Sequence, residues 1–167
     1  QDERVILVSG GGIGAGSVFN AAKSLAALRG TRVAVICGSN AKLFAQMKGY
    51  FRYKENVRIE GFVSNMEDYY AAADAAVMKP GGLSASEALC AGLPMLLIDP
   101  VPGQEELNMA YLTSNGAAWP LPRPSRAAES VVALFAGEAA QRMSAAAKEL
   151  ARPEAAGEII AKIAGEE

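Results

Sequence analysis

The chain has 167 residues, of which 51% are hydrophobic and 20% are charged, as in a soluble globular domain with a sizeable core. Its formal net charge of −2, with no compensating cluster of lysine and arginine, argues against a general nucleic-acid binder. Histidine is absent, which removes the commonest general base and metal ligand, and no Cys/His cluster suits zinc.

The two cysteines, Cys37 and Cys90, both lie in apolar stretches of sequence. This pattern predicts buried thiols in a reducing compartment. The sequence contains no apolar run long enough to span a bilayer and no signal peptide. The chain begins at Gln1 and enters a strand-like run almost at once, so we expect a fragment or an excised domain.

Apolar runs and helical periodicity predict strands that alternate with helices along the chain. The predicted strands cover residues 4–9, 31–37, 56–62, 75–78 and 95–98, with an edge strand over 116–119. The predicted helices cover residues 17–28, 41–48, 66–73 and 83–91, and alanine-rich C-terminal helices cover 125–150 and 154–164. This alternation predicts an α/β domain over residues 1–167 with a Rossmann-like, doubly wound parallel sheet.

A first glycine loop follows the first predicted strand and matches G-x-G-x-x-A at Gly10, Gly12 and Ala15. This motif is typical of dinucleotide sites, which also need an acidic residue at the end of the second strand. The second strand runs instead into Cys37 and Gly38 without a carboxylate, which weighs against NAD. Two interpretations remain: a backbone that a phosphate or another domain's substrate approaches, or tight strand–helix packing alone.

A second glycine turn, Lys79-Pro80-Gly81-Gly82, leads from the fourth predicted strand into a helix that Gly92 ends. Glycines at such a turn let a ligand approach the backbone, and the helix N-terminus offers free N–H groups and a positive dipole end. We therefore expect an anion site here, for phosphate. Lys79 would offset phosphate charge or, as a lone lysine before proline, would be solvated.

Glu87 has two interpretations. The spacing Ser84-x-x-Glu87 is that of a capping box, in which the glutamate binds the backbone N–H of the N-cap residue. Alternatively, a carboxylate in the first helical turn beside a phosphate site would accept hydrogen bonds from two ribose hydroxyls.

A polar loop follows the fifth predicted strand and carries Gln104, Glu105, Glu106 and Asn108 after a proline-glycine turn. Ligands of open α/β sheets lie at this edge, and amides with carboxylates suit sugar hydroxyls. The alternative is a solvated helix start, which we prefer for Glu106.

Four segments in this order, SGGGIGAG (9–16), EGFVSNMEDYYAAAD (60–74), KPGGLSASEALCAGLPM (79–95) and PVPGQEELN (100–108), resemble the C-terminal donor-binding domain of GT-B glycosyltransferases. The resemblance is closest to monogalactosyldiacylglycerol synthases and processive diacylglycerol glucosyltransferases, relatives of the peptidoglycan GlcNAc transferase. It covers nearly the whole chain, and it implies that the chain is one half of a GT-B fold.

The resemblance assigns the nucleotide of a UDP-hexose donor to matching positions. The backbone around Phe62 and Val63 would meet the uracil ring, and Glu87 would bind the ribose. The diphosphate would be held at the second glycine turn and the helix that follows it, by Gly81, Gly82, Leu83 and Ser84.

The resemblance also assigns the sugar and the reaction centre. Gln104, Glu105 and Asn108 would contact the donor hexose, and Gly11 and Gly12 would face the reaction centre. The catalytic base and the lipid acceptor site would belong to an N-terminal domain absent from this chain. The isolated domain would then bind donor and transfer nothing.

The implied reaction is inverting transfer of galactose or glucose from UDP-hexose to a lipid hydroxyl such as that of diacylglycerol, without a metal or cofactor. The full-length protein would be cytoplasmic and peripheral at the inner membrane face, with no nucleic-acid partner. Two alternatives remain: a domain like that of UDP-GlcNAc 2-epimerases, which the lack of histidine disfavours, and a non-catalytic Rossmann-like module that binds NAD or no ligand.

Overall fold

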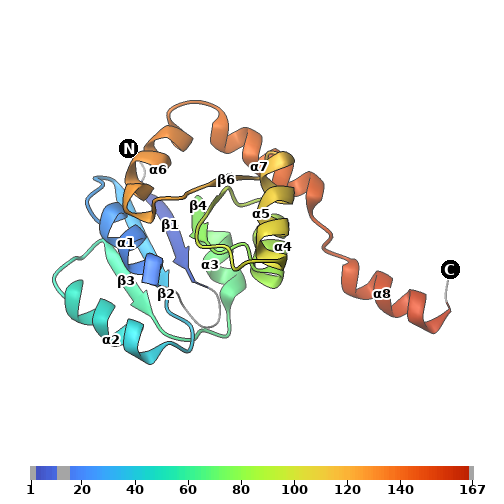
Figure 1. Cartoon of the computed structure of the whole chain (residues 1–167), viewed down its shortest axis with the longest axis horizontal. Coiled ribbons are helices and arrows are strands. Elements are labelled where there is room, and N and C mark those ends of the chain that lie inside the picture. The colour runs from blue at the N-terminus through green and yellow to red at the C-terminus, as the bar shows by residue number, and fades with distance from the viewer. Residues whose placement is uncertain (1–2, 11–15, 166–167) are drawn as a thin grey trace.

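The computed structural model describes residues 3–10 and 16–165. Its centre is a six-stranded sheet of order β3-β2-β1-β4-β5-β6 in which all neighbouring strands are parallel (Figure 1). The strands are β1 (Arg4–Ser9), β2 (Thr31–Ile36), β3 (Val57–Glu60), β4 (Ala75–Met78), β5 (Met95–Leu97) and β6 (Ala118–Pro120). The helices are α1 (Gly16–Leu25), α2 (Ala41–Tyr50), α3 (Met66–Ala72), α4 (Gly82–Cys90), α5 (Gln104–Ser114), α6 (Ala127–Phe135), α7 (Ala139–Leu150) and α8 (Ala155–Ala164), with a short 3-10 helix η1 (Pro124–Arg126).

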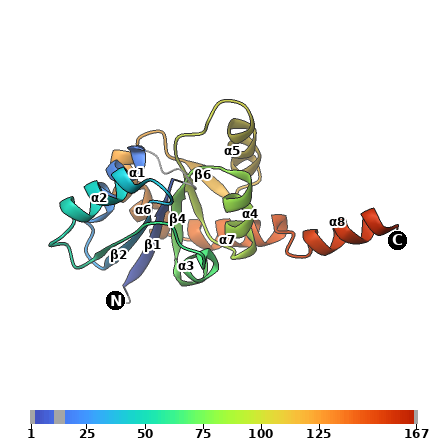
Figure 2. The ribbon, with the colours of Figure 1, turned by 90° about the horizontal axis from the view of Figure 1, so that it is seen from below.

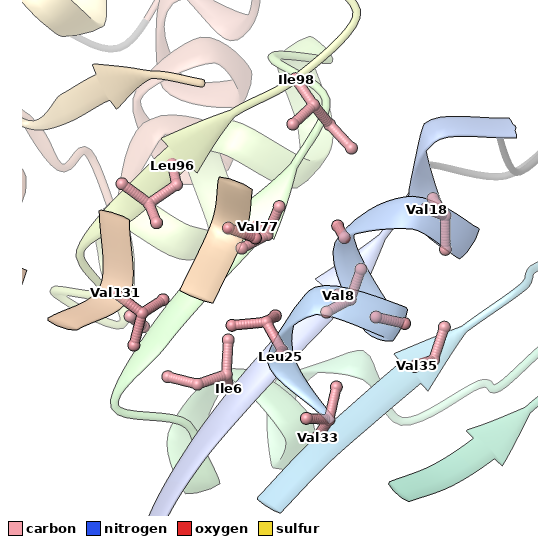
Figure 3. Packing of buried hydrophobic residues seen from close by; sticks show 14 of the residues in the cluster. Ile6, Val8, Val18, Leu25, Val33, Val35, Val77, Leu96, Ile98 and Val131 are labelled. Carbon is pink, nitrogen blue, oxygen red and sulfur yellow. The ribbon is translucent and has the colours of Figure 1, made fainter. Parts of the chain in front are cut away.

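Both faces of the sheet are buried, because successive side chains of a strand point to opposite sides. Ile6 and Val8 of β1 belong to one apolar cluster, whereas Leu7 between them belongs to the other. Figure 3 shows the first cluster, where Leu25 and Val131 pack on this face of the sheet. The continuous apolar runs of the sequence therefore correspond to strands covered on both sides.

Helices cover the two faces in separate groups. Buried side chains of α1, α2 and α6 belong to the cluster of Ile6, and buried side chains of α3, α4 and α5 belong to the cluster of Leu7. The α7 helix packs against both α4 and α6. The predicted doubly wound, Rossmann-like sheet is confirmed.

Most predicted elements differ from the structure by one or two residues at an end, and three of them differ more. The first helix stops at Leu25 rather than residue 28, because the amides of Ala27 and Leu28 bond to carbonyls three residues back, which tightens the last turn before Gly30. The predicted helix over 125–150 is divided into α6 and α7 around Gly137, a residue that disfavours helix interiors. The third strand covers Val57–Glu60 only.

Gly92 ends α4 as its sequence predicts. Its φ of +63° is left-handed, its amide bonds to the carbonyl of Leu89 at 2.9 Å, and the amide of Leu93 bonds to that of Ala88 at 2.9 Å. These two bonds form a Schellman motif. The left-handed backbone favours glycine here, and a Cβ atom would also lie 2.4 Å from Cε of Lys148 in α7, whose side chain would have to move.

The two thiols differ in their surroundings. Cys37 is fully buried, and burial raises its pKa to about 11. Cys90 is exposed on α4, so the prediction of two buried thiols is wrong for this residue. The helical face that carries Cys90 turns away from the sheet, which apolar neighbours in the sequence do not reveal.

The α8 helix extends away from the rest of the domain in both views (Figures 1 and 2). None of its residues is buried, and its apolar side chains Ile159, Ile160 and Ile163 are exposed. Among the helices of the described part of the chain, none has the length and apolar character needed to cross a bilayer.

Candidate functional site

The candidate site lies at the carboxyl edge of the sheet, where strands β1 and β4 are neighbours. From β1 the strand order continues outward to β2 and β3, and from β4 it continues the opposite way to β5 and β6. Connections that diverge in this way leave a crevice at which open α/β sheets bind ligands. The first glycine loop follows β1, but Gly11 and Gly12 lie outside the described residues, and their role at a reaction centre stays a prediction.

A small cavity of about 80 Å³ opens at this switch point. It brings together Phe62 and Val63 from the connection after β3 with Ser84 from α4. The remaining lining residues come from β1, β2 and α3 and from the connection after β2: Ser9, Ile36, Gly38, Met66 and Tyr70. Phe62 is 77% exposed, so its ring is accessible from solvent. Residues that the resemblance assigns to the uracil ring and to the diphosphate thus line one cavity.

The N-terminus of α4 is built on the second glycine turn. Gly81 is the N-cap residue, and its carbonyl accepts the amide of Ala85 at 2.8 Å. The first amides of a helix, here those of Gly82, Leu83 and Ser84, have no intrahelical acceptor and form the positive end of its dipole. Such a terminus binds anions. The predicted placement of a helix N-terminus at this turn is confirmed.

The predicted capping box of Ser84 and Glu87 is wrong. Because α4 begins at Gly82, Ser84 is its third residue and Glu87 lies in the second turn. The N-cap residue is Gly81, which has no side chain to act as a cap, and no side chain makes a capping hydrogen bond at this end of α4. The ribose interpretation also assumed that Glu87 lies in the first turn, near the positive end of the helix dipole. The structure corrects this assumption, because Glu87 lies in the second turn.

Glu87 instead faces Tyr70 across a second cavity of about 570 Å³ between α3 and α4. Tyr70 is 3% exposed, and its hydroxyl lies close enough to Ser84 and Glu87 for both side chains to affect its pKa. Burial, and secondarily Glu87, raise the pKa of Tyr70 to about 12. Tyr70 lines both cavities, so one buried phenol connects the residues predicted to bind diphosphate and ribose.

Lys79 and Glu105 form an ion pair beside the second glycine turn, with Nζ and Oε2 3.4 Å apart. Their side chains are 17% and 25% exposed, and the amide of Val101 also donates to Glu105 Oε2 at 2.8 Å. The other oxygen, Oε1, lies 3.8 Å from the position of a Cβ on Gly81. Lys79 is thus paired rather than solvated as a lone lysine, and Glu105, the second residue of α5, is a partly exposed residue at a helix start.

Helix α5 is tied to the same turn through Asn108, whose Nδ2 donates to the carbonyl oxygen of Pro80 at 2.9 Å. Gln104, its first residue, is exposed. Glu106 is exposed too, as preferred from the sequence, and its carboxylate accepts the amide of Gly103 at 3.1 Å. Gly103 has φ +98° and ψ −114°, a conformation that only glycine adopts without strain.

Sequence reasoning missed two features of this edge. Tyr70 reaches Ser84 and Glu87 from another helix, and no local spacing signals that contact. Asp99, after β5, has a positive φ of 44°, which aspartate tolerates better than most residues. Within residues 3–10 and 16–165, no group of three or more His, Cys, Asp or Glu residues is arranged to hold a metal ion.

Fold and site together define a Rossmann-like, GT-B-type domain with a ligand crevice at the carboxyl edge of its sheet. The chain belongs to the family of glycosyltransferase family 28 C-terminal domains, whose family model matches residues 5–163.

Two relatives are similar over most of this chain. Monogalactosyldiacylglycerol synthase 2, chloroplastic, of Arabidopsis thaliana is 34% identical over 98% of this chain and 37% of its own length. Processive diacylglycerol beta-glucosyltransferase of Bacillus licheniformis is 32% identical over 82% of this chain and 36% of its own length. The chain therefore spans little more than a third of the length of these relatives.

Solved structures share the fold at lower identity. MurG of Acinetobacter baumannii superimposes with a TM-score of 0.77 at 21% identity, over 98% of this chain and 52% of that one. A UDP-N-acetylglucosamine 2-epimerase attributed to Listeria monocytogenes superimposes with a TM-score of 0.72 at 16% identity, over 97% and 45%. At these identities the likeness establishes the GT-B fold alone.

Proposed function

We propose that this chain is the donor-binding half of a glycosyltransferase that transfers galactose or glucose from UDP-hexose to a lipid such as diacylglycerol. The observation that carries the proposal is the pair of adjoining cavities, joined by Tyr70, that gather Phe62, Val63, Ser84 and Glu87 at the switch point. The two relatives named above are supporting context, because both names combine a hexose with diacylglycerol.

Each part of the donor has a matching part of the site. The uracil ring enters the smaller cavity beside the backbone of Phe62 and Val63. Glu87 accepts hydrogen bonds from the ribose hydroxyls, a neutral diol that suits an ionised carboxylate. The diphosphate meets the free amides at the N-terminus of α4, in the turn that contains Gly81 and Gly82.

The hexose lies toward α5. Gln104 is exposed there, and Asn108 lies on the same helix with its amide on Pro80. Glu105 has one carboxylate oxygen occupied by Lys79 and Val101, so Oε1 is the atom available to a sugar hydroxyl near Gly81. These side chains provide hydrogen-bond donors and acceptors that suit the hydroxyls of a hexose.

The reaction we propose is a direct displacement with inversion. A lipid hydroxyl oxygen bonds to the anomeric carbon while the bond from that carbon to the β-phosphate oxygen breaks, and the hydroxyl proton passes to a base. UDP leaves with the electron pair, and the amides at the start of α4 stabilise its growing negative charge without a metal or cofactor. The base and the lipid site belong to an N-terminal domain, which meets the inner membrane face in the cytoplasmic full-length protein.

A UDP-GlcNAc 2-epimerase-like function is the second candidate, because the fold alone is compatible with it. The transferase relatives are 34% and 32% identical, against 16% for the epimerase structure, which favours transfer. A non-catalytic module that binds NAD is the third. Comparing the affinities of UDP, UDP-galactose, UDP-glucose, UDP-GlcNAc and NAD by calorimetry ranks all three.

The decisive experiment is calorimetry of UDP and 2′-deoxy-UDP with the chain and with Glu87→Ala. We expect Glu87→Ala to weaken UDP binding by about 1.5–3 kcal/mol, the range for hydrogen bonds to a charged group. The loss on removing the 2′-hydroxyl from the ligand should largely vanish in the variant, because the same contact is already gone. Glu158→Ala, on the exposed α8 helix, is the matched control. Absence of UDP binding to the folded chain would overturn the proposal.

A further inference from the structure

The structure gathers lysines and arginines at one end of the sheet, although the net charge is −2. Residues 42–58 contain one carboxylate, Glu55, and five cations: Lys42, Lys48, Arg52, Lys54 and Arg58. The last four line one open groove of about 450 Å³ along the end of α2, the following turn and β3. The expectation of no Lys/Arg cluster is therefore wrong: the helix end and the edge strand bring these residues together.

Most of the positive charge in this groove is uncompensated. The groove contains one carboxylate, that of Glu60, which pairs with Arg58 at 2.6 Å. The ion pairs formed within the described part of the chain do not include Lys48, Arg52 or Lys54. These three exposed cations thus present a local positive field to solvent.

An exposed aromatic side chain lies among the cations. Tyr53 is 81% exposed, and the guanidinium of Arg52 lies 4.4 Å from the centre of its ring. Tyr50, at the end of α2, is 52% exposed. Tyrosine rings beside lysine and arginine are typical of protein surfaces at the headgroup level of a bilayer. We call the set of Lys48, Arg52, Tyr53, Lys54 and Arg58 the basic edge.

The basic edge lies away from the donor site. The turn between α2 and β3 lies at the amino edge of the sheet, because the parallel strand β3 starts there, whereas the crevice lies at the carboxyl edge. A partner bound here leaves the crevice between β1 and β4 open. Charge on an edge strand also prevents pairing between sheets, which accounts for Arg58 but not for Lys48 and Arg52, which lie outside the strand.

We propose that the basic edge docks this domain on the surface of a bilayer that contains anionic phospholipids. Cations within a Debye length of such a surface are attracted to it, and the exposed tyrosine suits the interfacial region. The choice of a membrane as partner rests on the lipid acceptor of the proposed function, since that substrate resides in a bilayer. The surface would act in addition to any contact by other parts of the protein.

The test is co-sedimentation of the chain with vesicles of phosphatidylcholine, with and without phosphatidylglycerol. We expect binding only to the anionic vesicles, weakening as salt is raised. The double variant Arg52→Glu/Lys54→Glu should bind at least about tenfold more weakly, because each cation near the surface contributes several-fold. Arg123→Glu/Arg152→Glu, with the same charge change at exposed sites elsewhere, should bind like the unmodified chain.

Three outcomes would overturn this proposal: no preference for anionic vesicles, an equal loss in the two double variants, or tighter binding of a single-stranded oligonucleotide than of vesicles. Circular dichroism verifies that the variants remain folded. UDP calorimetry on the same proteins separates this surface from the donor site. The basic-edge variant should retain UDP affinity, so loss of vesicle binding and loss of donor binding are distinguishable results.

Discussion

The side-chain amide of Asn108 donates a 2.9 Å hydrogen bond to the carbonyl oxygen of Pro80, across a sequence separation of 28 residues. This bond fixes α5 against the turn that begins α4. It therefore joins the helix assigned to the hexose to the glycine turn assigned to the diphosphate. The relative position of these two segments therefore depends on a contact between helix α5 and the turn that follows β4.

Asn108→Ala should lower the free energy of unfolding by about 1 kcal/mol, because the carbonyl of the buried Pro80 loses its donor. It should also weaken binding of UDP-hexose more than binding of UDP. Urea denaturation and calorimetry measure the two effects. The control is Asn115→Ala. The side-chain amide of Asn115 donates to the carbonyl of Tyr111 and to the hydroxyl of Ser114, both in α5, and so does not link α5 to another element. Equal changes in both variants would contradict the linking role of Asn108.

Lys79→Met should destabilise the domain by about 1–2 kcal/mol, because it leaves the partly buried Glu105 carboxylate without its cation. This value lies between those typical of exposed and of buried ion pairs. Urea denaturation measures the loss. Arg142→Met breaks an exposed pair with Glu138 and should change stability by less than about 0.5 kcal/mol. In a double-mutant cycle with Glu105→Gln, additive effects would show that the two side chains do not interact.

Tyr70→Phe should weaken UDP binding by about 0.5–1.5 kcal/mol, because the hydroxyl that lies beside Ser84 and Glu87 is removed while the ring stays packed. Calorimetry measures the change. Tyr69→Phe is the matched control, since Tyr69 is adjacent and packs against the same apolar cluster. If both variants bind UDP like the unmodified chain, Tyr70 has no positioning role.

A thiol reagent should modify Cys90 rapidly and Cys37 slowly in the folded protein. Cys90 is exposed, whereas burial raises the pKa of Cys37 to about 11 and so suppresses its thiolate. Because Cys90 lines the cavity of Glu87, UDP should slow its modification. Absorbance with a disulfide reagent measures the rates, and Cys90→Ser should abolish the fast phase. A fast phase that persists in this variant would refute the assignment.

Stability should fall in alkaline solution above pH 9. Burial raises the pKa of Cys37 from 9.0 to about 11 and that of Tyr70 from 10.0 to about 12. The unfolded chain thus releases these protons at lower pH than the folded chain, so their contribution is complete below pH 9 and is lost between pH 9 and 12. Urea denaturation over this range measures the decline, and Cys37→Ala should delay its onset. A flat profile would contradict the burial of both groups.

Local patterns determined most of the fold. The apolar run 75–78 is the buried strand β4 without a change of boundary, and Gly92 ends α4 with the predicted left-handed residue. The ends of α1 and α6 were not predictable to the residue, because tightened last turns and caps there depend on the packing of the following segment.

The candidate site was predicted in part. The glycine turn at Gly81 and the start of α4 follow from local conformational preference. The roles of the residues around them were assigned from the resemblance to GT-B donor-binding domains. The fold then placed Phe62, Val63 and Ser84 on one cavity. The predicted capping box is wrong because α4 begins two residues before Ser84, with Gly81 as its N-cap residue. The pairing of Lys79 with Glu105 joins two separate segments of the chain, so local spacing does not predict it.

The sequence by itself determined the alternation of strands and helices, the positions of its glycine turns and the family to which it belongs. The alternation and the turns arise from backbone preferences and apolar periodicity, which act over a few residues, whereas the family follows from the resemblance of four sequence segments. Only the tertiary structure decided that Tyr70 contacts Ser84 and Glu87, that Cys90 faces solvent and that four cations share one groove. These arrangements involve more than one element, so they depend on the order of the strands and on which face each helix buries.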